Sequence, residues 1–269
     1  MINFPSFEQN YKCPICEGKV FRCSKALLID KKTKIDWIND SSFELSELKE
    51  ATSYLTTCFR CFHSLLVPYY DVSKLYQPKL GFEVRKKYYE NYFPEKIYGE
   101  KSGLSTNLNI FEKSSKELHR FQKNINLMSK LFKFDQMIYE EFSILDYGGG
   151  DGYISSIFSK VFGAILDKKV DFCIYDFTQW KNSEGKFLDR KINKKFDLII
   201  LSHVLEHNHN PTGLLNEIIK YANQDSIIYI EVPDQRYVLL KGLLGKRFGM
   251  NYHVSYFSKT SLQKLFNKC

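Results

Sequence analysis

Long apolar runs are absent from this chain of 269 residues. No stretch of about eighteen uninterrupted apolar residues occurs, and the start, "MINFPSFEQNYK", lacks the basic-then-apolar layout of a secretory signal. Internal repeats, low-complexity tracts and blocks of clustered lysine are also missing. These absences exclude a membrane-spanning helix, argue against export and predict a cytoplasmic protein.

The composition supplies the material for a sizeable core. Apolar residues make up 43% of the chain and aromatic residues 16%, enough for one large or two unequal globular domains. The chain carries 39 lysines and arginines against 31 acidic residues, a net charge of +8. This excess suits anionic partners such as nucleotide-linked substrates or RNA, although scattered lysines are also typical of a solvated surface.

Residue patterns divide the chain into three expected regions. Residues 1–70 contain two cysteine pairs, and residues 71–140 combine an aromatic, charged segment with a helical period of apolar residues within 110–140. Residues 141–269 alternate short apolar runs, "FSILDY", "VDFCIYD", "FDLIILS" and "SIIYIEV", with helical stretches. Such alternation predicts an α/β fold with a mostly parallel sheet covered by helices.

The stretch "SILDYGGGDGYIS", residues 143–155, places glycines in a turn between an expected strand and helix. Glycine lacks a Cβ atom, so it adopts backbone angles that other residues resist and lets a ligand approach the main chain. The motif consists of an acid and four glycines: Asp146, Gly148, Gly149, Gly150 and Gly152. Taken alone, this pattern indicates a turn with space for a ligand.

A second motif lies in "KKFDLIILSHVLEHNHNPTGLLNEI". The expected strand "FDLIILS" ends at Ser202, the pair Glu206 and His207 follows, and Pro211 begins a helix. An imidazole titrates near neutral pH, so His207 is suited to take a proton from a substrate hydroxyl, and Glu206 is suited to orient that imidazole or bind the substrate.

The two motifs, in this order and spacing, resemble those of class I S-adenosylmethionine-dependent methyltransferases, and the likeness covers about residues 142–266. The resemblance implies a Rossmann-like core and S-adenosylmethionine as the methyl donor, with Asp146, the four glycines and Ser202 at the cofactor. A second acid is then expected at the next strand end, where it binds the ribose. Asp176 is favoured over Asp167 because it ends the more β-like run.

Two further histidines bear on the chemistry that the resemblance implies. Some relatives, such as ubiquinone-pathway O-methyltransferases, hold a divalent ion with an acid three residues before the Glu-His pair. His203 occupies that position here, so a catalytic ion is not favoured and stays an open alternative. His253, in "NYHVSYFSKTSLQKLF", resembles the His-x-x-Tyr-Phe-Ser element that follows the fifth strand in this subset, and core packing explains it equally well.

Two Cys-x-x-Cys pairs predict a structural zinc site. Cys13, Cys16, Cys58 and Cys61 together offer four thiolates to one tetrahedral Zn²⁺, which leaves no open coordination position for catalysis. The long intervening segment is tolerable because loop-closure entropy grows slowly with length. Cys23 and His63 are further candidate ligands, whereas Cys173 and Cys269 are expected to be unrelated to the site.

A cysteine module, a tyrosine-rich connection and this core together resemble bacterial nucleotide-sugar methyltransferases. The resemblance implies a cytoplasmic enzyme acting on a small, anionic, nucleotide-linked acceptor or another capsule precursor such as a phosphoramidate group. The stretch "KKYYENYF", residues 86–93, would then line the substrate side. The sugar C-methyltransferases of this kind continue with a second large C-terminal domain, whereas this chain ends at Cys269, so we expect O-methylation of a smaller acceptor rather than C-methylation. The usual final β-hairpin of the class I fold is also missing, so we expect five strands and either a sheet edge covered by a second subunit or a shortened chain.

Two alternative functions stay open from the sequence. "CPICEG" resembles the zinc element of some bacterial ribosomal-RNA guanine methyltransferases, against which the Leu-Glu-His ending and the lack of a basic block argue. A non-catalytic, zinc-containing binding protein with a methyltransferase-like core is the other alternative. The acceptor and its reacting atom do not follow from the sequence.

Overall fold

The computed structural model describes residues 11–27, 52–67, 115–132, 141–150, 152–176, 186–188, 192–236 and 253–269. Two compact units make up the chain. The cysteine unit combines residues 1–72 with 203–219 and 231–269, and the sheet unit combines residues 73–202 with 220–230. The tyrosine-rich stretch 86–93 lies outside the described residues, and the division at residues 70 and 140 stays a prediction.

A five-stranded sheet forms the centre of the sheet unit and confirms the expected α/β class and strand number. Its strands are β4 (Ser143–Tyr147), β5 (Asp171–Tyr175), β6 (Lys186–Phe187), β7 (Phe196–Ser202) and β8 (Ala222–Glu231). Their order is β6-β5-β4-β7-β8, and β4 pairs in parallel with both β5 and β7. The carboxyl ends of β4, β5 and β7 therefore meet at one edge of the sheet, where α/β folds bind ligands.

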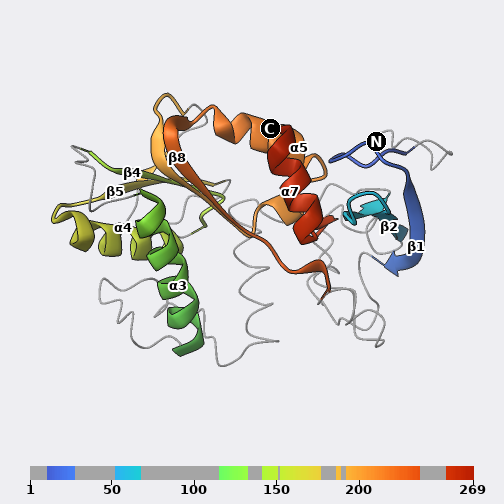
Figure 1. Ribbon diagram of the computed structural model, residues 1–269, viewed down its shortest axis with the longest axis horizontal. Helices are drawn as coiled ribbons and strands as arrows, with labels where there is room; N and C mark the ends of the chain where they lie inside the picture. Colours follow the sequence, from blue (N-terminus) through green and yellow to red (C-terminus); the bar gives the residue numbers. More distant parts are fainter. Residues whose placement is uncertain are drawn as a thin grey trace, which may run out of the picture. The chain divides into compact units, whose positions relative to one another are not determined.

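Helix α4 (Tyr153–Leu166) packs on β4 and β5, and helix α3 (Ser115–Phe132) packs against α4 (Figure 1). Met128 and Phe132 of α3 and Phe158 and Phe162 of α4 belong to one buried cluster with the apolar residues of the strands. The helix expected within residues 110–140 is thus found with narrower bounds. Among the described residues, no helix combines the length and apolar character needed to cross a membrane.

The cysteine unit contains a four-stranded antiparallel sheet in the order β1-β2-β3-β9. Its strands are β1 (Val20–Leu27), β2 (Thr52–Cys58), β3 (Ser64–Val67) and β9 (Ser255–Tyr256). The unit also contains the short 3₁₀ helix η4 (Leu205–His207) and helices α5 (Pro211–Ile219) and α7 (Lys259–Lys268). The C-terminal strand β9 thus joins the sheet of the N-terminal cysteine module, a pairing that the sequence did not predict.

We expect the core of the sheet unit to depend on Phe158 of α4. This ring is fully buried, and its centroid lies 5.8 Å from that of Phe162 and 5.7 Å from that of Tyr229. Phe158→Ala should lower the free energy of unfolding by about 3–5 kcal/mol, because it removes buried surface and leaves a cavity. Ile165→Ala on the exposed side of the same helix should change it by less than about 0.5 kcal/mol. Urea denaturation followed by circular dichroism would contradict this if both variants shifted equally.

Candidate active site and cysteine cluster

The glycine turn between β4 and α4 has the backbone that its sequence predicts. Gly148, Gly150 and Gly152 have φ angles of 72°, 58° and 79°, in the left-handed region that favours glycine. The amide of Gly148 donates to the carbonyl of Tyr175, which ties the turn to the end of β5. The turn is therefore held at the carboxyl edge of the parallel strands.

At two of the glycines a larger residue would clash, because the backbone passes close to side chains of the sheet. A Cβ atom at Gly149 would lie 2.3 Å from Cγ of Asp146, and one at Gly152 would lie 2.4 Å from Cδ1 of Ile174. At Gly150, by contrast, no atom of the described residues lies within 4 Å of the added Cβ. The loop is thus packed against the sheet on one side and open at Gly150, a shape that fits a ligand placed against the main chain.

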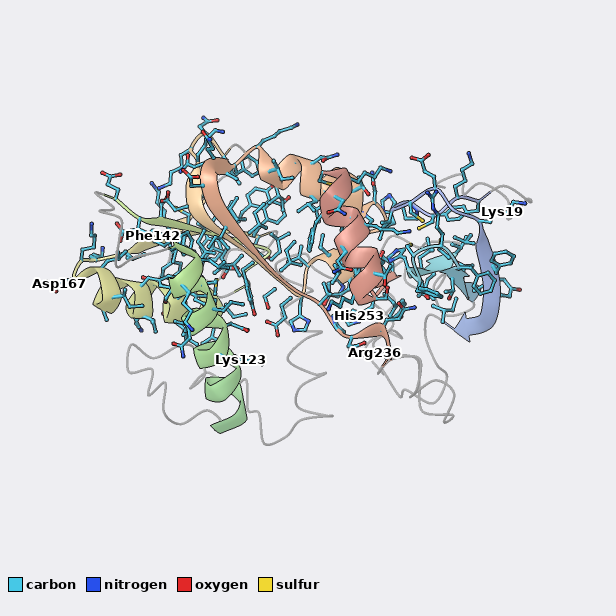
Figure 2. The ribbon with its side chains drawn as sticks, viewed as in Figure 1. Lys19, Lys123, Phe142, Asp167, Arg236 and His253 are labelled. Atoms are coloured by element: carbon cyan, nitrogen blue, oxygen red, sulfur yellow. The ribbon has the colours of Figure 1, made fainter. Side chains whose placement is uncertain are left out.

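Two acidic residues lie next to the glycine loop. Asp146 is buried, and its Oδ2 accepts a 2.7 Å hydrogen bond from the hydroxyl of Ser155, a residue that the sequence did not single out. Asp176 follows β5 directly, and its Oδ2 accepts a 2.8 Å hydrogen bond from the amide of Gly150. Asp167 instead caps the carboxyl end of α4 (Figure 2). Asp176, the acid that the sequence favours, therefore adjoins the glycine loop. Asp167, the alternative, lies at the end of a helix and not at the end of β5.

Three further candidate site residues gather in the cysteine unit. Ligand atoms of Glu206, His207 and His253 all lie within 4.8 Å of one another. Glu206 and His207 belong to η4, which is separated from β7 by two residues, whereas His253 precedes β9. The ring centroids of the two histidines are 4.8 Å apart in an edge-to-face arrangement. The structure thus brings together the predicted pair and the more distant histidine, whose sequence signal was its place before Tyr256 and Phe257.

The carboxylate of Glu206 lies at the centre of this cluster and is 1% exposed. Its Oε1 lies 2.9 Å from Nδ1 of His203 and 4.0 Å from Nε2 of His253. Within the described part of the chain, Oε2 is buried without a hydrogen-bond partner. A buried carboxylate oxygen of this kind favours a ligand that donates a hydrogen bond to it, since a buried oxygen without a hydrogen-bond partner costs free energy.

His203 and His253 differ in their surroundings. His203 has a left-handed backbone with φ of 57° and a side chain that is 49% exposed, whereas the side chain of His253 is 15% exposed. Burial lowers the pKa of His253 to about 4, and repulsion from His207 acts in the same direction, while Glu206 opposes the shift. His253 is therefore neutral at physiological pH and able to accept a hydrogen bond.

The four predicted cysteines converge on one point. Ligand sulfurs of Cys13, Cys16, Cys58 and Cys61 lie within 4.8 Å of one another, with 3.6 Å between Cys13 and Cys61 and 3.5 Å between Cys16 and Cys58. A tetrahedral zinc ion with Zn–S bonds of about 2.3 Å separates its sulfurs by about 3.8 Å. The chemistry and spacing of the donors therefore fit Zn²⁺, which leaves no position for a substrate.

Hydrogen bonding within the cluster favours ionisation of Cys13 and opposes that of Cys61. The pKa of Cys13 is lowered to about 5, chiefly by the hydrogen bond that it shares with Cys61, and the pKa of Cys61 is raised by the same hydrogen bond and by burial. A bound cation would ionise all four thiols and release the remaining protons.

The other proposed or excluded ligands lie elsewhere. His63 is fully buried beside the ring of Phe257, at 4.9 Å between centroids, and is not a member of the four-cysteine group. Cys173 is buried within β5, and Cys269 caps the end of α7. The side chain of Cys23 lies outside what the structure describes. The expectation that Cys173 and Cys269 are separate from the cluster agrees with these positions.

One family model and several solved structures are similar to this chain. A family model described as "Methyltransferase domain" matches residues 109–269. A search of curated proteins finds no match. The structure of the plantazolicin methyltransferase BpumL, bound to a monoazolic desmethylPZN analog and SAH, is 18% identical with a TM-score of 0.40, and the match covers 69% of this chain and 74% of that one.

Two other solved structures show similar likeness. The YcgJ protein from Bacillus subtilis is 17% identical, with a TM-score of 0.38, and the match covers 54% of this chain and 67% of that chain. A complex between the Haloferax volcanii Trm112 methyltransferase activator and the putative methyltransferase gives 13% identity and a TM-score of 0.35, covering 55% of this chain and 70% of that chain.

Burial of His253 predicts a pH-dependent stability. The folded pKa of about 4 is below the unfolded value of 6.5, so the unfolded chain binds the extra proton between these values. Stability contributed by neutral His253 is therefore present above pH 6.5 and lost as the pH falls to 4, by about 3 kcal/mol in total. His253→Asn should lose less stability than the wild type over this range, and the exposed control His209→Asn should behave as the wild type. Equal pH dependence of all three proteins in urea unfolding would contradict the assignment.

Proposed function

The chain belongs to the methyltransferase-domain family and is an S-adenosylmethionine-dependent methyltransferase, and from this premise we propose that it methylates a hydroxyl group of a small, anionic acceptor. The observation that carries the proposal is the cluster of Glu206, His207 and His253, in which Glu206 is buried and one of its carboxylate oxygens has no hydrogen-bond partner among the described residues. Glu206 and His207 belong to η4, which is the next element after β7 in the chain.

The glycine loop is the proposed seat of the cofactor. S-adenosylmethionine supplies a methyl group on a positively charged sulfur. We assign the methionine end of the cofactor to the loop formed by Gly148, Gly149, Gly150 and Gly152, which Asp146 supports, with Ser202 at the end of β7. Asp176 is suited to bind the ribose, since its carboxylate already adjoins the open position at Gly150 and carries a second oxygen.

The acceptor is assigned to the cluster in the cysteine unit. Oε2 of Glu206 would accept a hydrogen bond from the acceptor and so fix its orientation, because this buried oxygen otherwise lacks a partner among the described residues. His207 is the proposed base, which takes the hydroxyl proton as that oxygen gains the methyl group. The neutral imidazole of His253 packs edge-to-face on His207 and limits its movement.

A nucleotide-linked sugar or another capsule precursor, such as a phosphoramidate, is the proposed acceptor class. The net charge of +8 favours an anionic molecule, and the unpaired carboxylate oxygen favours one that presents a hydroxyl. The four-cysteine cluster is proposed to hold structural Zn²⁺, since its sulfurs have the number and spacing that the ion requires.

Gly149→Ala should weaken cofactor binding. The added Cβ would lie 2.3 Å from Cγ of buried Asp146, so either the loop or the carboxylate must move. We expect the dissociation constant for S-adenosylmethionine to rise at least about tenfold in calorimetric titrations. Ile165→Ala, on the exposed side of α4, is the matched control and should bind normally. Undiminished binding by Gly149→Ala, or no binding by the wild type, would contradict the assignment of the loop.

His207→Gln should separate chemistry from cofactor binding. Loss of the base should lower the turnover of an active acceptor by about 10²–10⁴-fold while the affinity for S-adenosylmethionine is unchanged. A panel of nucleotide-linked sugars and a ribosomal-RNA fragment serve as acceptors, and the release of demethylated cofactor is measured. His209→Gln, an exposed histidine two residues away, is the control and should retain activity. Full activity in His207→Gln would exclude it as the base, and turnover of RNA alone would replace the proposed acceptor class.

A further inference from the structure

The backbone of Val254 joins the cysteine module to the active-site cluster. Its amide donates a 2.8 Å hydrogen bond to the carbonyl of Glu206, and its carbonyl accepts a 2.9 Å hydrogen bond from the amide of Leu66. Val254 is buried and directly follows His253. One peptide segment thus sets the separation of His253 from Glu206 and is itself hydrogen-bonded to the strand β3.

Ser255 adds a second connection of the same kind. Its hydroxyl donates a 2.7 Å hydrogen bond to the carbonyl of Asn208, the residue that follows η4, and its backbone pairs with Leu65 of β3. Ser255 is 1% exposed, so water does not compete for these bonds. We call η4 together with Asn208, residues 205–208, the Glu206 turn. The position of the Glu206 turn relative to His253 therefore depends on the position of β3.

The strand β3 is in turn positioned by the second cysteine pair. Cys58 ends β2, Cys61 lies in the loop, and β3 begins three residues later, so this pair is the connection of a β-hairpin. The loop is closed by hydrogen bonds from the amide of Cys58 to the carbonyl of His63 and from the amide of Phe62 to that of Cys58. Small hairpins have little stability of their own, and a bound metal ion commonly supplies it.

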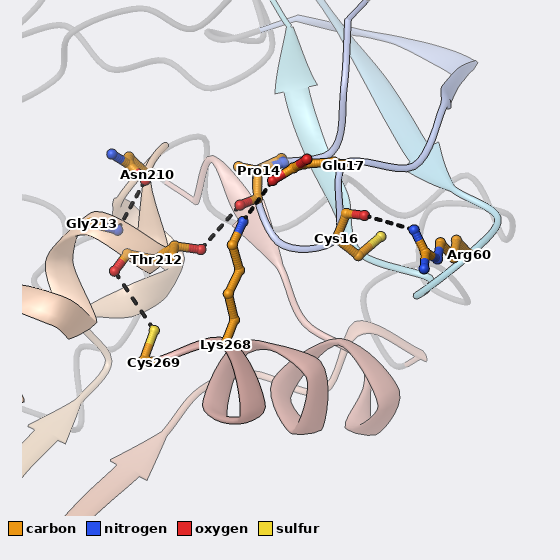
Figure 3. A network of polar contacts seen from close by, with 9 residues as sticks. All are labelled: Pro14, Cys16, Glu17, Arg60, Asn210, Thr212, Gly213, Lys268 and Cys269. Atoms are coloured by element: carbon orange, nitrogen blue, oxygen red, sulfur yellow. Dashed lines mark hydrogen bonds and ion pairs between the residues drawn. The ribbon is translucent and has the colours of Figure 1, made fainter.

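Both cysteine loops also contact the helices that flank the cluster. In the first loop, the carbonyl of Pro14 accepts a 3.0 Å hydrogen bond from the hydroxyl of Thr212 in α5, and Glu17 pairs with Lys268 of α7 (Figure 3). In the second loop, the carbonyl of Cys61 accepts a 2.9 Å hydrogen bond from the hydroxyl of Ser258, which caps α7. The helices that follow η4 and β9 in the chain, α5 and α7, are thus attached to the loops of the four-cysteine cluster.

We propose that the four-cysteine cluster, when it holds its metal ion, is a positioning element for the active site: through β3, Val254 and Ser255 it holds His253 against Glu206. This inference rests on the proposed zinc site and on the proposed catalytic role of the cluster. The metal does not take part in methyl transfer. Its removal frees the hairpin, and the hydrogen bonds of Val254 and Ser255 to the Glu206 turn are lost with it.

Amide exchange of the full-length, zinc-loaded protein tests this coupling. Zinc content is measured by mass spectrometry, zinc is then removed with EDTA, and Cys58→Ser provides a second zinc-depleted protein. Exchange in peptides covering residues 205–208 and 253–257 should rise at least about tenfold after zinc removal, as expected when buried hydrogen bonds open locally. Exchange in β4 and in the buried turns of α4 should stay unchanged, and calorimetric binding of S-adenosylmethionine should persist.

Ser255→Ala separates positioning from metal binding. It removes the hydrogen bond to Asn208 without touching a cysteine, so zinc content should stay at the wild-type value while exchange at residues 205–208 rises. Ser255→Thr keeps the hydroxyl and should restore protection. Ser129→Ala in α3, which removes a hydroxyl bonded to the carbonyl of Ile125, is the matched control and should leave residues 205–208 unaffected.

The outcomes of these experiments are distinguishable. Zinc removal that leaves exchange at residues 253–257 unchanged would overturn the positioning role, as would a protein that binds no metal ion at its cysteines. Neither result would affect cofactor binding by the sheet unit. A chain that binds no S-adenosylmethionine, yet shows increased exchange on zinc loss, would instead overturn the proposed function and retain the coupling between the cysteines and the Glu206 turn.

Discussion

The parallel pairing of β4 with both β5 and β7 is the constraint on which the candidate cofactor site depends. In this register, Asp146 lies beside Ile174 of one strand and Ile200 of the other, so the three strands end at the same edge. The ends of β4, β5 and β7 therefore determine the positions of the glycine turn, Asp176 and Ser202. Because the strands are almost wholly buried, a slip in register would expose apolar side chains, and the hydrophobic core therefore fixes the position of the polar loop.

The cysteine unit is stabilised by other interactions than those of the sheet unit. Its antiparallel sheet is small, and its stability depends on strands and loops from both ends of the chain. The four thiols supply a site for a metal ion, and hydrogen bonds from Thr212 and Ser258 attach the cysteine loops to α5 and α7. The cysteine loops are thus hydrogen-bonded within the same unit that contains η4 and His253.

The sequence predicted features whose signals are local and missed those that arise from tertiary contacts. Glycine spacing, the β-like run before Asp176 and the two Cys-x-x-Cys pairs each carry their own physical signature, so the loop and the cysteine cluster were foreseeable. The pairing of β9 with β3 was not, because two-residue strands have no detectable period. The support of Asp146 by Ser155, and the carboxylate of Glu206 between His203 and His253, depend on side-chain directions that spacing alone does not specify.

The contribution of β9 to an N-terminal sheet has a consequence for synthesis on the ribosome. Strands β1, β2 and β3 leave the ribosome first, whereas β9 (Ser255–Tyr256), the partner of β3, follows only after residues 68–254 have been made. At translation rates of about 5–20 residues per second, the edge of β3 waits about 10–40 s for Ser255 and Tyr256. During that interval β3 is paired with β2 on one side only, and early capture of a metal ion by the neighbouring cysteines would protect its open edge from association with neighbouring nascent chains.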